Sequence, residues 1–251
     1  MSGSGFSNGF SNNLGSDGFG NGFSSPKISV PISGLLLYLD AGNSTSYPGS
    51  GTTWFDLADT PTTNNATLVN SPTYSTNNGG YFTFAKTASQ SATVSGNGMV
   101  PSAAYTKSVW FYLNDLTSDH NLVSSDVGGH FMFFSGTPKL YCGHANWTTG
   151  GAYTQYPSTT NFSAGTWYHA VLTYTTADGM KLYVNGTLDS TYTANKTAHI
   201  GTGETNVGRF GAGNFLNGRV SHVLTYDRAI SDNEVYSIYN SIKSRYGLLF
   251  V

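Results

Sequence analysis

The feature of this sequence that most constrains its fold is an alternation of short apolar runs with residues that favour turns. The stretch WYHAVLTYTTADGMKLYVNGTLDSTYT, residues 167–193, shows it most clearly, because Asp178-Gly179 and Asn185-Gly186 each separate two runs rich in Tyr, Leu, Val and Thr. Such dipeptides accept the positive φ angles that tight hairpin turns require. We therefore expect two consecutive β-hairpins in this stretch.

Runs of the same kind recur from residue 28 onward at roughly the 8–12-residue spacing that is typical of a sandwich of antiparallel strands. Charged residues make up only 10% of the chain and aromatic residues 14%, whereas an average globular protein has about 25% charged residues. This composition favours an all-β domain over a helical or disordered one. The expected strands are LLLYLD (35–40), YFTFA (81–85), KSVWFYL (107–113), HFMFFS (130–135), KLYCG (139–143), WYHAVLTYT (167–175), MKLYVNG (180–186), NVGRF (206–210) and RVSHVLTYD (219–227).

One short helix is expected near the C-terminal end, in SDNEVYSIYNSIKSRYG, residues 231–247. Ser231 and Glu234 have the spacing of a capping box, and Gly247 is placed to end the helix. The apolar residues at helical spacing are Val235, Ile238, Tyr239 and Ile242. They predict that this helix packs on the sandwich.

The N-terminal region has a different composition, in which Gly, Ser and Asn surround a few aromatic rings. A 13-residue unit occurs twice in succession, first as GFSNGFSNNLGSD (5–17) and then as GFGNGFSSPKISV (18–30). The rings are those of Phe6, Phe10, Phe19 and Phe23. We divide the chain into an extended arm, residues 1–27, and a folded domain, residues 28–251.

The arm is interpreted as an attachment segment whose phenylalanine rings fill pockets on a partner. Burying four rings would contribute about 6–12 kcal/mol at ~1.5–3 kcal/mol each, which is less than the backbone entropy of ordering roughly 26 residues at ~1–2 kcal/mol apiece. The arm would therefore also need main-chain hydrogen bonds to the partner, such as strand addition to a sheet edge. The alternative is a flexible linker in which the rings are incidental.

Charge and cysteine content exclude several classes. The net charge is −2 and the 11 basic residues form no cluster, so the sequence does not favour nucleic-acid binding. Cys142 is the one cysteine, which excludes an intramolecular disulfide and favours synthesis in a reducing compartment such as a host cytoplasm. The first lysine is Lys27 and the early run LLLYL is short, so we expect neither a signal sequence nor a membrane span.

Several segments together carry a family resemblance. They are LLLYLDAGNSTSYPGSGTTWFDL (35–57), GGYFTF (79–84), GTWYHAVLTYTTADGMKLYVNGTL (165–188), VGRFGAGNFLNGRVSHVLTYDRAISDNEV (207–235) and YNSIKSRYGL (239–248). The chain resembles, over about residues 32–248, the LamG-like domains of the concanavalin A-like lectin/glucanase superfamily, of the type found in bacteriophage structural proteins. The resemblance implies a jelly-roll sandwich of two curved antiparallel sheets with six or seven strands each.

The resemblance does not extend to the catalytic pattern of the glucanases, a Glu-x-Asp-x-x-Glu strand whose two carboxylates lie about 5 Å apart for retaining hydrolysis. Glu204 and Glu234 are the two glutamates of the chain, and neither has an acidic partner at that spacing. Asp pairs such as Asp56/Asp59 and Asp115/Asp119 are interpreted as turn and cap residues. We therefore expect a protein that is not an enzyme.

Metal binding is considered at two places. Cys142 and His144, with His120 and His130 nearby in sequence, could suggest a transition-metal site, but isolated neighbours of this kind are usually structural. The resemblance also implies a possible calcium site, because many LamG-like domains bind calcium at one rim, and Asp40 and Asn43 in LDAGN are the candidates. The alternative is a tight turn whose side chains bond their own backbone. We expect no other cofactor.

A candidate glycan-binding surface lies in YCGHANWTTGGAYTQY, residues 141–156, which has no strong strand pattern. Carbohydrate sites combine aromatic faces with planar polar groups, usually on loops at the rim of a sandwich. The candidates are Tyr141, His144, Asn146, Trp147, Tyr153, Gln155 and Tyr156. The alternative is that a chain with 17 tyrosines has an aromatic loop by chance and that Trp147 caps the core.

The functional hypothesis is a non-enzymatic phage virion structural protein, most specifically a capsid decoration protein. Its arm would anchor multiple copies to capsid or other virion subunits and display a lectin-like domain at the virion surface. The sequence has none of the heptad, Gly-X-Y or β-helix repeats that long fibres normally need. The alternative is a carbohydrate-binding receptor module of a phage tail or fibre, with cell-surface glycans as partners.

Overall fold

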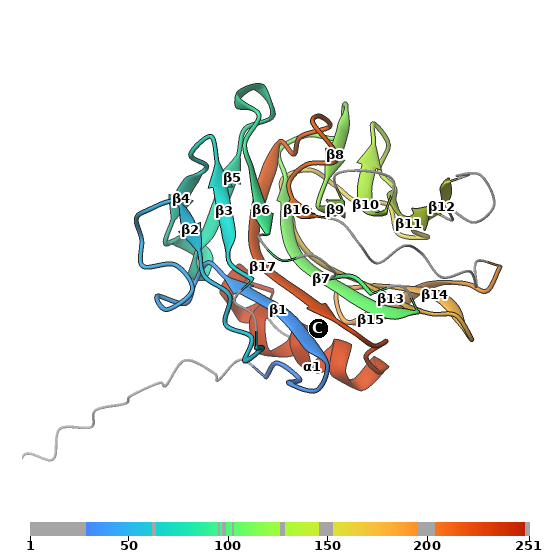
Figure 1. Ribbon diagram of the computed structural model, residues 1–251. Coiled ribbons are helices and arrows are strands. Elements are labelled where there is room, and N and C mark those ends of the chain that lie inside the picture. The colour runs from blue at the N-terminus through green and yellow to red at the C-terminus, as the bar shows by residue number, and fades with distance from the viewer. Residues whose placement is uncertain are drawn as a thin grey trace, which may run out of the picture.

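The computed structural model describes residues 29–61, 64–94, 96, 99–101, 103–125, 129–145, 153–194 and 204–248. These residues form a sandwich of antiparallel strands with one α-helix near the C-terminal end (Figure 1). The expected arm, with Phe6, Phe10, Phe19 and Phe23, lies outside the described residues. No described helix is long and apolar enough to cross a membrane.

The larger sheet has eight strands in the order β15–β14–β13–β7–β17–β5–β4, and β1 pairs with β17 as well. Their bounds are β15 Thr187–Tyr192, β14 Gly179–Val184, β13 Trp167–Thr175, β7 Ala104–Leu113, β17 Gly218–Tyr226, β5 Tyr81–Phe84, β4 Thr73–Ser75 and β1 Leu35–Asp40. The long strands β7, β13 and β17 form its centre and curve around the core (Figure 1).

The second layer consists of two smaller sheets that lie side by side. The five-stranded sheet has the order β2–β3–β6–β16–β9, with bounds Thr53–Trp54, Ala66–Val69, Ser91–Val94, Thr205–Val207 and Val123–Ser125. The four-stranded sheet has the order β12–β11–β10–β8, with bounds Tyr153–Pro157, Leu140–Ala145, His130–Ser135 and Asp119–Asn121. Leu122 joins β8 to β9 and donates a backbone hydrogen bond to Met132 in β10, so the two sheets are continuous at this point.

Apolar side chains fill both faces of the larger sheet. The main core lies between the layers and includes fully buried residues of both, such as Val109 in β7 and Phe134 in β10. The helix α1, Asp232–Ile242, covers the opposite face (Figure 1), where Val235, Ile238 and Ile242 pack against the larger sheet. This arrangement confirms the all-β sandwich and the packing of the helix on it.

Local sequence patterns predicted the strongest elements well. The expected strands at 35–40, 130–135 and 167–175 coincide with β1, β10 and β13. Both hairpin turns form where expected, with positive φ at Gly179, Asn185 and Gly186. The capping box of α1 is present, because Ser231 accepts from the backbone of Glu234 while the Glu234 side chain accepts from the backbone of Ser231.

Three features differ from the sequence-based expectation. The sheets do not have six or seven strands each, because one has eight and the other layer is divided into sheets of five and four. Strands β2, β3, β4, β6, β8 and β9 were not predicted, since each has only two to four residues and several are polar. The segment 153–157, expected in a loop, is strand β12, which pairs with β11.

Candidate ligand-binding pocket

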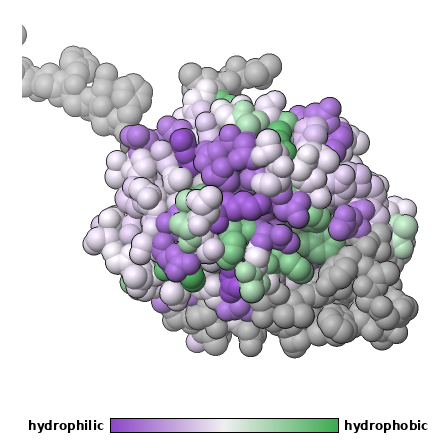
Figure 2. All heavy atoms as spheres, turned by 90° about the horizontal axis from the view of Figure 1, so that it is seen from above, coloured by the Kyte–Doolittle hydropathy of each residue, from purple (hydrophilic) through white to green (hydrophobic). Residues whose placement is uncertain are grey.

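The four-stranded sheet carries a pocket of about 310 Å³ on its outer face. Met132 and Phe134 of β10 are fully buried in the core, so the alternate residues of this strand face away from it. Figure 2 looks onto this side of the molecule, where hydrophobic areas border hydrophilic ones. The lining residues are Asp119, Asn121, Phe131, Phe133, Ser135, Gln155, Phe210 and Asn214.

The strand register brings residues far apart in sequence into rows on this face. Phe131 lies opposite Gly143, which in turn lies opposite Gln155. Because glycine has no side chain, this row leaves open space between an aromatic ring and a carboxamide. The pocket therefore has a floor of main chain at Gly143 with Phe131 and Gln155 on either side.

The neighbouring row extends the aromatic part of the pocket. Phe133 lies opposite Asn121 of β8 on one side and Tyr141 of β11 on the other. The rings of Phe133 and Tyr141 are 5.7 Å apart between centroids, a distance at which aromatic pairs attract each other. Tyr141 thus continues the aromatic surface beyond the lining residues. Asn121 is buried beside Phe133, and its Oδ1 accepts a hydrogen bond from Ser124.

The segment after β16 forms a wall beside β8. Asn121 Nδ2 donates to the carbonyl oxygen of Asn214 at 2.9 Å. Phe210 and Gly213 exchange two backbone hydrogen bonds of 3.2 and 3.1 Å. These contacts hold Phe210 and Asn214 against the sheet, so this wall of the pocket is positioned before a ligand arrives.

A buried lysine supports the pocket strands from the core side. Lys107 of β7 is fully buried, and its Nζ donates to the carbonyl oxygens of Phe131 at 3.0 Å and Val123 at 3.2 Å. Nζ also lies 3.3 Å from Nδ1 of His130. Burial lowers the pKa of Lys107 to about 7, because a charged ammonium loses its hydration there. This contact ties the larger sheet to β9 and β10.

The residues predicted from sequence as a glycan-binding loop do not form one loop. Tyr141 and His144 lie in β11, and Tyr156 lies in β12. Asn146 and Trp147 lie outside the described residues, and Tyr153 is described only as the first residue of β12, paired with Ala145. Their proposed role in binding stays a prediction.

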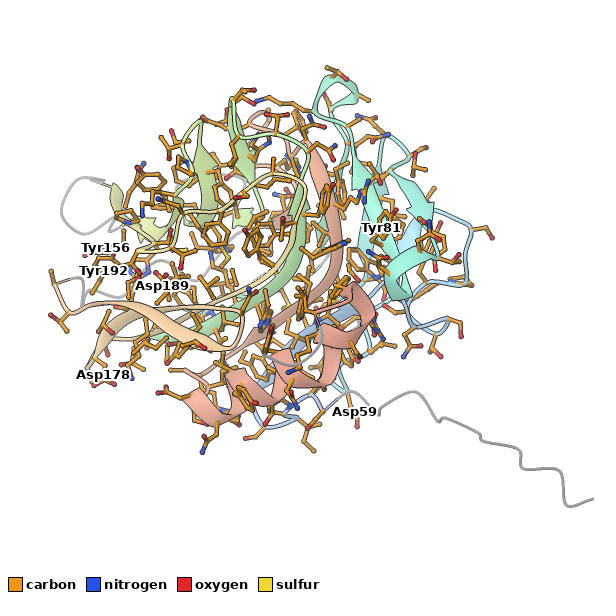
Figure 3. The ribbon with its side chains drawn as sticks, turned by 180° about the vertical axis from the view of Figure 1, so that it is seen from behind. Asp59, Tyr81, Tyr156, Asp178, Asp189 and Tyr192 are labelled. Atoms are coloured by element: carbon orange, nitrogen blue, oxygen red, sulfur yellow. The ribbon has the colours of Figure 1, made fainter. Side chains whose placement is uncertain are left out.

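Two of the predicted residues point into the core, contrary to an exposed glycan platform. His144 is fully buried, and its Nδ1 lies 3.0 Å from the hydroxyl of Tyr105. Tyr156 is 9% exposed and stacks on Tyr192 with ring centroids 4.4 Å apart (Figure 3). Successive side chains of a strand point to opposite faces of the sheet. Tyr141 therefore lies on the outer face, whereas Cys142 and His144 lie on the face toward the core. Tyr141 alone of these three borders the pocket.

The calcium candidates are engaged with protein groups. Both carboxylate oxygens of Asp40 accept hydrogen bonds from Arg245, at 2.7 and 3.0 Å, and one also accepts from the backbone of Gly42. Asn43 Oδ1 accepts from the backbone of Thr45. A calcium ion would have to displace the guanidinium, so these residues do not fit a calcium site. Within the described residues, no group of three or more His, Cys, Asp or Glu side chains is placed to hold a metal.

Both glutamates are engaged in ion pairs. Glu204 pairs with Arg209 at 3.0 Å, and Glu234 caps α1 while bonding to Arg228. The hydrogen bond from Arg228 lowers the pKa of Glu234 to about 2 and outweighs the opposing effect of burial. A carboxylate held ionised in this way is not suited to act as a general acid near neutral pH.

Asp115, close in sequence to the pocket residue Asp119, is also committed to local structure. Its carboxylate accepts from the backbone of Thr117, from Nδ2 of Asn217 and from His120. Burial tends to raise its pKa, yet these hydrogen bonds outweigh it and the pKa falls to about 2. The pKa of His120 is lowered, chiefly by burial, so its contact with Asp115 is a hydrogen bond of the neutral ring at pH 7.

Sequence reasoning missed most of the pocket. HFMFFS was recognised as a strand, but an unbroken run of aromatic residues does not reveal which face each ring takes. A usable signal was present in the sequence: Asp119 and Asn121 are two residues apart, as are Phe131 and Phe133, which is the spacing of residues on one face of a strand. The pairing of these two strands could not be read from that spacing.

The chain was compared with known proteins by sequence and by structure. A sequence model described as "Concanavalin A-like lectin/glucanases superfamily" matches residues 86–236, more than half of the chain. Among curated proteins, none matches the chain by sequence.

Solved structures with a similar fold include neurotoxin binding domains and a sialidase. The botulinum neurotoxin serotype D binding domain aligns with a TM-score of 0.63 at 12% identity, over 83% of this chain and 52% of that one. The binding domain of botulinum neurotoxin DC in complex with SialylT has a TM-score of 0.63 at 11% identity, over 84% and 52%. The sialidase of Trypanosoma rangeli has a TM-score of 0.60 at 17% identity, over 86% and 34%. The chain thus spans about a third to a half of these structures, and at this identity the likeness shows the fold alone.

Proposed function

Because the chain belongs to the concanavalin A-like lectin/glucanases superfamily, we propose that it is a non-catalytic carbohydrate-binding domain whose site is the pocket on the outer face of β8, β10, β11 and β12. The observation that carries the proposal is the row Phe131–Gly143–Gln155, which places an aromatic ring and a carboxamide on either side of an open strip of main chain. The pocket volume of about 310 Å³ lies within the range of small-molecule sites.

The chemistry of the lining suits a pyranose. One face of the sugar ring presents C–H groups that pack on aromatic side chains, and its hydroxyls both donate and accept hydrogen bonds. Phe133 and Phe210, both half-buried, supply apolar contacts, and Phe131, which is 4% exposed, lies in the same wall. Gln155 is exposed and supplies a carboxamide that can donate and accept. Asn121 is buried, and its carboxamide bonds to Asn214 and Ser124, so it shapes the pocket wall.

A binding role rather than hydrolysis is supported by the carboxylates. Among the described lining residues, Asp119 alone has a carboxyl group. Retaining and inverting hydrolysis both require two carboxyl groups across the scissile bond. Glu204 and Glu234 are held by arginines, and Asp115 is held by Asn217 and His120.

The similar structures are consistent with a ligand-binding use of this fold, since one of the toxin binding domains was solved in complex with SialylT and one sialidase structure contains the inhibitor DANA. Those ligands are properties of those proteins. For this chain they support only the general expectation that a sugar is a suitable class of ligand to test.

The proposal is tested by applying the protein to a glycan array and then measuring the affinity of the best ligand by calorimetry. Phe133→Ala removes a half-buried ring from the pocket and should weaken binding about tenfold or more. Phe55→Ala is the matched control, because Phe55 is 40% exposed and lies after β2, away from the pocket. If no glycan binds, or if both variants bind as the wild type does, the proposal is wrong.

We further propose that the domain is a structural protein of a phage virion, carried in multiple copies at the particle surface and attached through residues 1–27. Supporting this are the twofold Gly-Phe unit and the start of β1 at Leu35, which leaves the four arm phenylalanines upstream of the first strand. A capsid decoration protein and a tail or fibre receptor module both remain compatible with a glycan-binding domain. The number of copies per purified particle distinguishes them.

Deletion of residues 2–25 tests the attachment. The shortened protein should fold with an unchanged circular dichroism spectrum but no longer copurify with particles. Phe→Ser at positions 6, 10, 19 and 23 should weaken copurification stepwise, because linked contacts act together through local concentration. Asn→Ser changes at Asn8 and Asn21 of the same arm serve as controls. Full occupancy of particles by the shortened protein would refute the attachment role.

A further inference from the structure

The charge of the pocket is one-sided. Asp119 is the single charged residue among its described lining residues, and the others are aromatic, amide or hydroxyl side chains.

Basic groups near this sheet are engaged with other protein groups. Arg209, which precedes the lining residue Phe210, pairs with Glu204, and Lys139, which precedes β11, donates to the main-chain oxygen of Thr159. Lys86 Nζ donates to the main-chain oxygen of Asp119 at 3.1 Å, and Lys86 is not a lining residue. His120 is fully buried on the core side of β8, and burial lowers its pKa, so it is neutral at pH 7. Lys107 lies beneath the sheet and donates to main-chain oxygens there. The lining therefore offers an anionic ligand no cation of its own.

We infer that this pocket selects neutral, hydroxyl-rich glycans and discriminates against acidic ones such as sialylated, uronic acid or sulfated sugars. The inference rests on the proposed carbohydrate-binding function and specifies its ligand class. It sets this chain apart from the similar structure that was solved with SialylT.

The physical reason is the like charge of Asp119. A neutral sugar hydroxyl can donate to this carboxylate and gain a charge-assisted hydrogen bond. An acidic sugar would instead bring a second negative charge into a partly enclosed site, where repulsion is stronger than in water and where no lining cation compensates for lost hydration. We expect about a tenfold or greater difference in affinity between a neutral glycan and its acidic counterpart.

The variant Asp119→Asn removes the negative charge of the pocket while keeping the size of the side chain. The amide has the same size, keeps the main-chain oxygen that Lys86 binds, and still accepts a hydrogen bond. This variant should narrow the difference between neutral and acidic glycans to about threefold or less while retaining binding of the neutral ligand. Asp178→Asn is the matched control, since it makes the same change in net charge in the turn between β13 and β14 (Figure 3).

The experiment is an array of neutral glycans printed beside their sialylated, uronic acid and sulfated counterparts, followed by calorimetry on the best matched pair. The inference holds if the wild type prefers the neutral member and Asp119→Asn, but not Asp178→Asn, loses that preference. Raising the salt concentration should improve the weak binding of the acidic member, because salt screens repulsion, and should leave the neutral member unchanged.

The outcomes separate the inference from the proposed function. Equal or tighter binding of the acidic member by the wild type refutes the inference and leaves the carbohydrate-binding function standing. A preference for the neutral member that Asp119→Asn does not alter also refutes it. Failure of every glycan to bind refutes the function and the inference together.

Discussion

Lys107 makes the stability of this domain depend on pH in a direction opposite to that of most lysines. It is fully buried between the two layers, where its Nζ donates to the carbonyl oxygens of Val123 and Phe131. Burial lowers its pKa in the folded protein from 10.5 to about 7. The folded state therefore binds the proton of Lys107 more weakly than the unfolded chain does. As a result, the lysine lowers the free energy of unfolding at pH values below its pKa in the unfolded chain.

The size of this effect follows from the two pKa values. The difference between 10.5 and about 7 is about 3.5, which at ~1.36 kcal/mol for each pKa unit corresponds to a destabilisation on the order of 5 kcal/mol below pH 7. The destabilisation disappears as the pH rises from 7 toward 10.5. Between pH 7 and pH 9 this residue should raise the free energy of unfolding by about 2 kcal/mol.

Other buried groups define the pH range in which Lys107 can be observed. Burial lowers the pKa of His169 to about 3 and that of His222 to about 4, so these residues affect stability mainly below pH 7. Burial raises the pKa of the Cys142 thiol from 9.0 to about 12, which makes the folded protein lose stability as the pH rises above 9. Between pH 7 and pH 9 the change in the free energy of unfolding therefore comes mainly from Lys107.

Urea denaturation followed by tryptophan fluorescence at pH 7, 8 and 9 measures the effect. The free energy of unfolding of the wild type should rise by about 2 kcal/mol over this range, and Lys107→Met should remove most of the rise because the apolar side chain does not titrate. Lys181→Met on β14 is the control, since Lys181 is half-exposed and should not change the slope. A flat wild-type profile, or the same slope in Lys107→Met, would refute the reasoning.

Three further outcomes are expected. Asp40→Ala should lower the free energy of unfolding by about 3 kcal/mol, because Arg245 loses its bidentate partner, and Asp40→Ala should cost much less in an Arg245→Ala background. Ser231→Ala should cost about 1 kcal/mol in thermal denaturation through loss of the N-cap, whereas Ser231→Thr should restore most of it. Prolonged incubation with laminarin or agarose should release no reducing sugar, and sustained release that Asp119→Asn abolishes would contradict a non-catalytic role.

Local patterns in the sequence determined the elements whose signals lie within a few residues. The turn at Asn185-Gly186 was readable because few other dipeptides accept positive φ at both positions. The start of α1 was readable because Ser231 and Glu234 complete a capping box within one turn. Strand β13 was readable from its apolar run and the hairpin that follows. These signals also sufficed for the class of fold.

The tertiary structure alone decided which side chains meet. Arg245 and Asp40 are 205 residues apart, and their pairing depends on the packing of the C-terminal turn against β1. Phe131, Gly143 and Gln155 line one row because three strands pair in one register, and a shift of one residue would have turned each of them to the other face. The same register placed Tyr141 beside the pocket and His144 in the core. Residue type in the sequence indicates which groups can bind a ligand, but strand pairing between distant segments determines which of them share a surface.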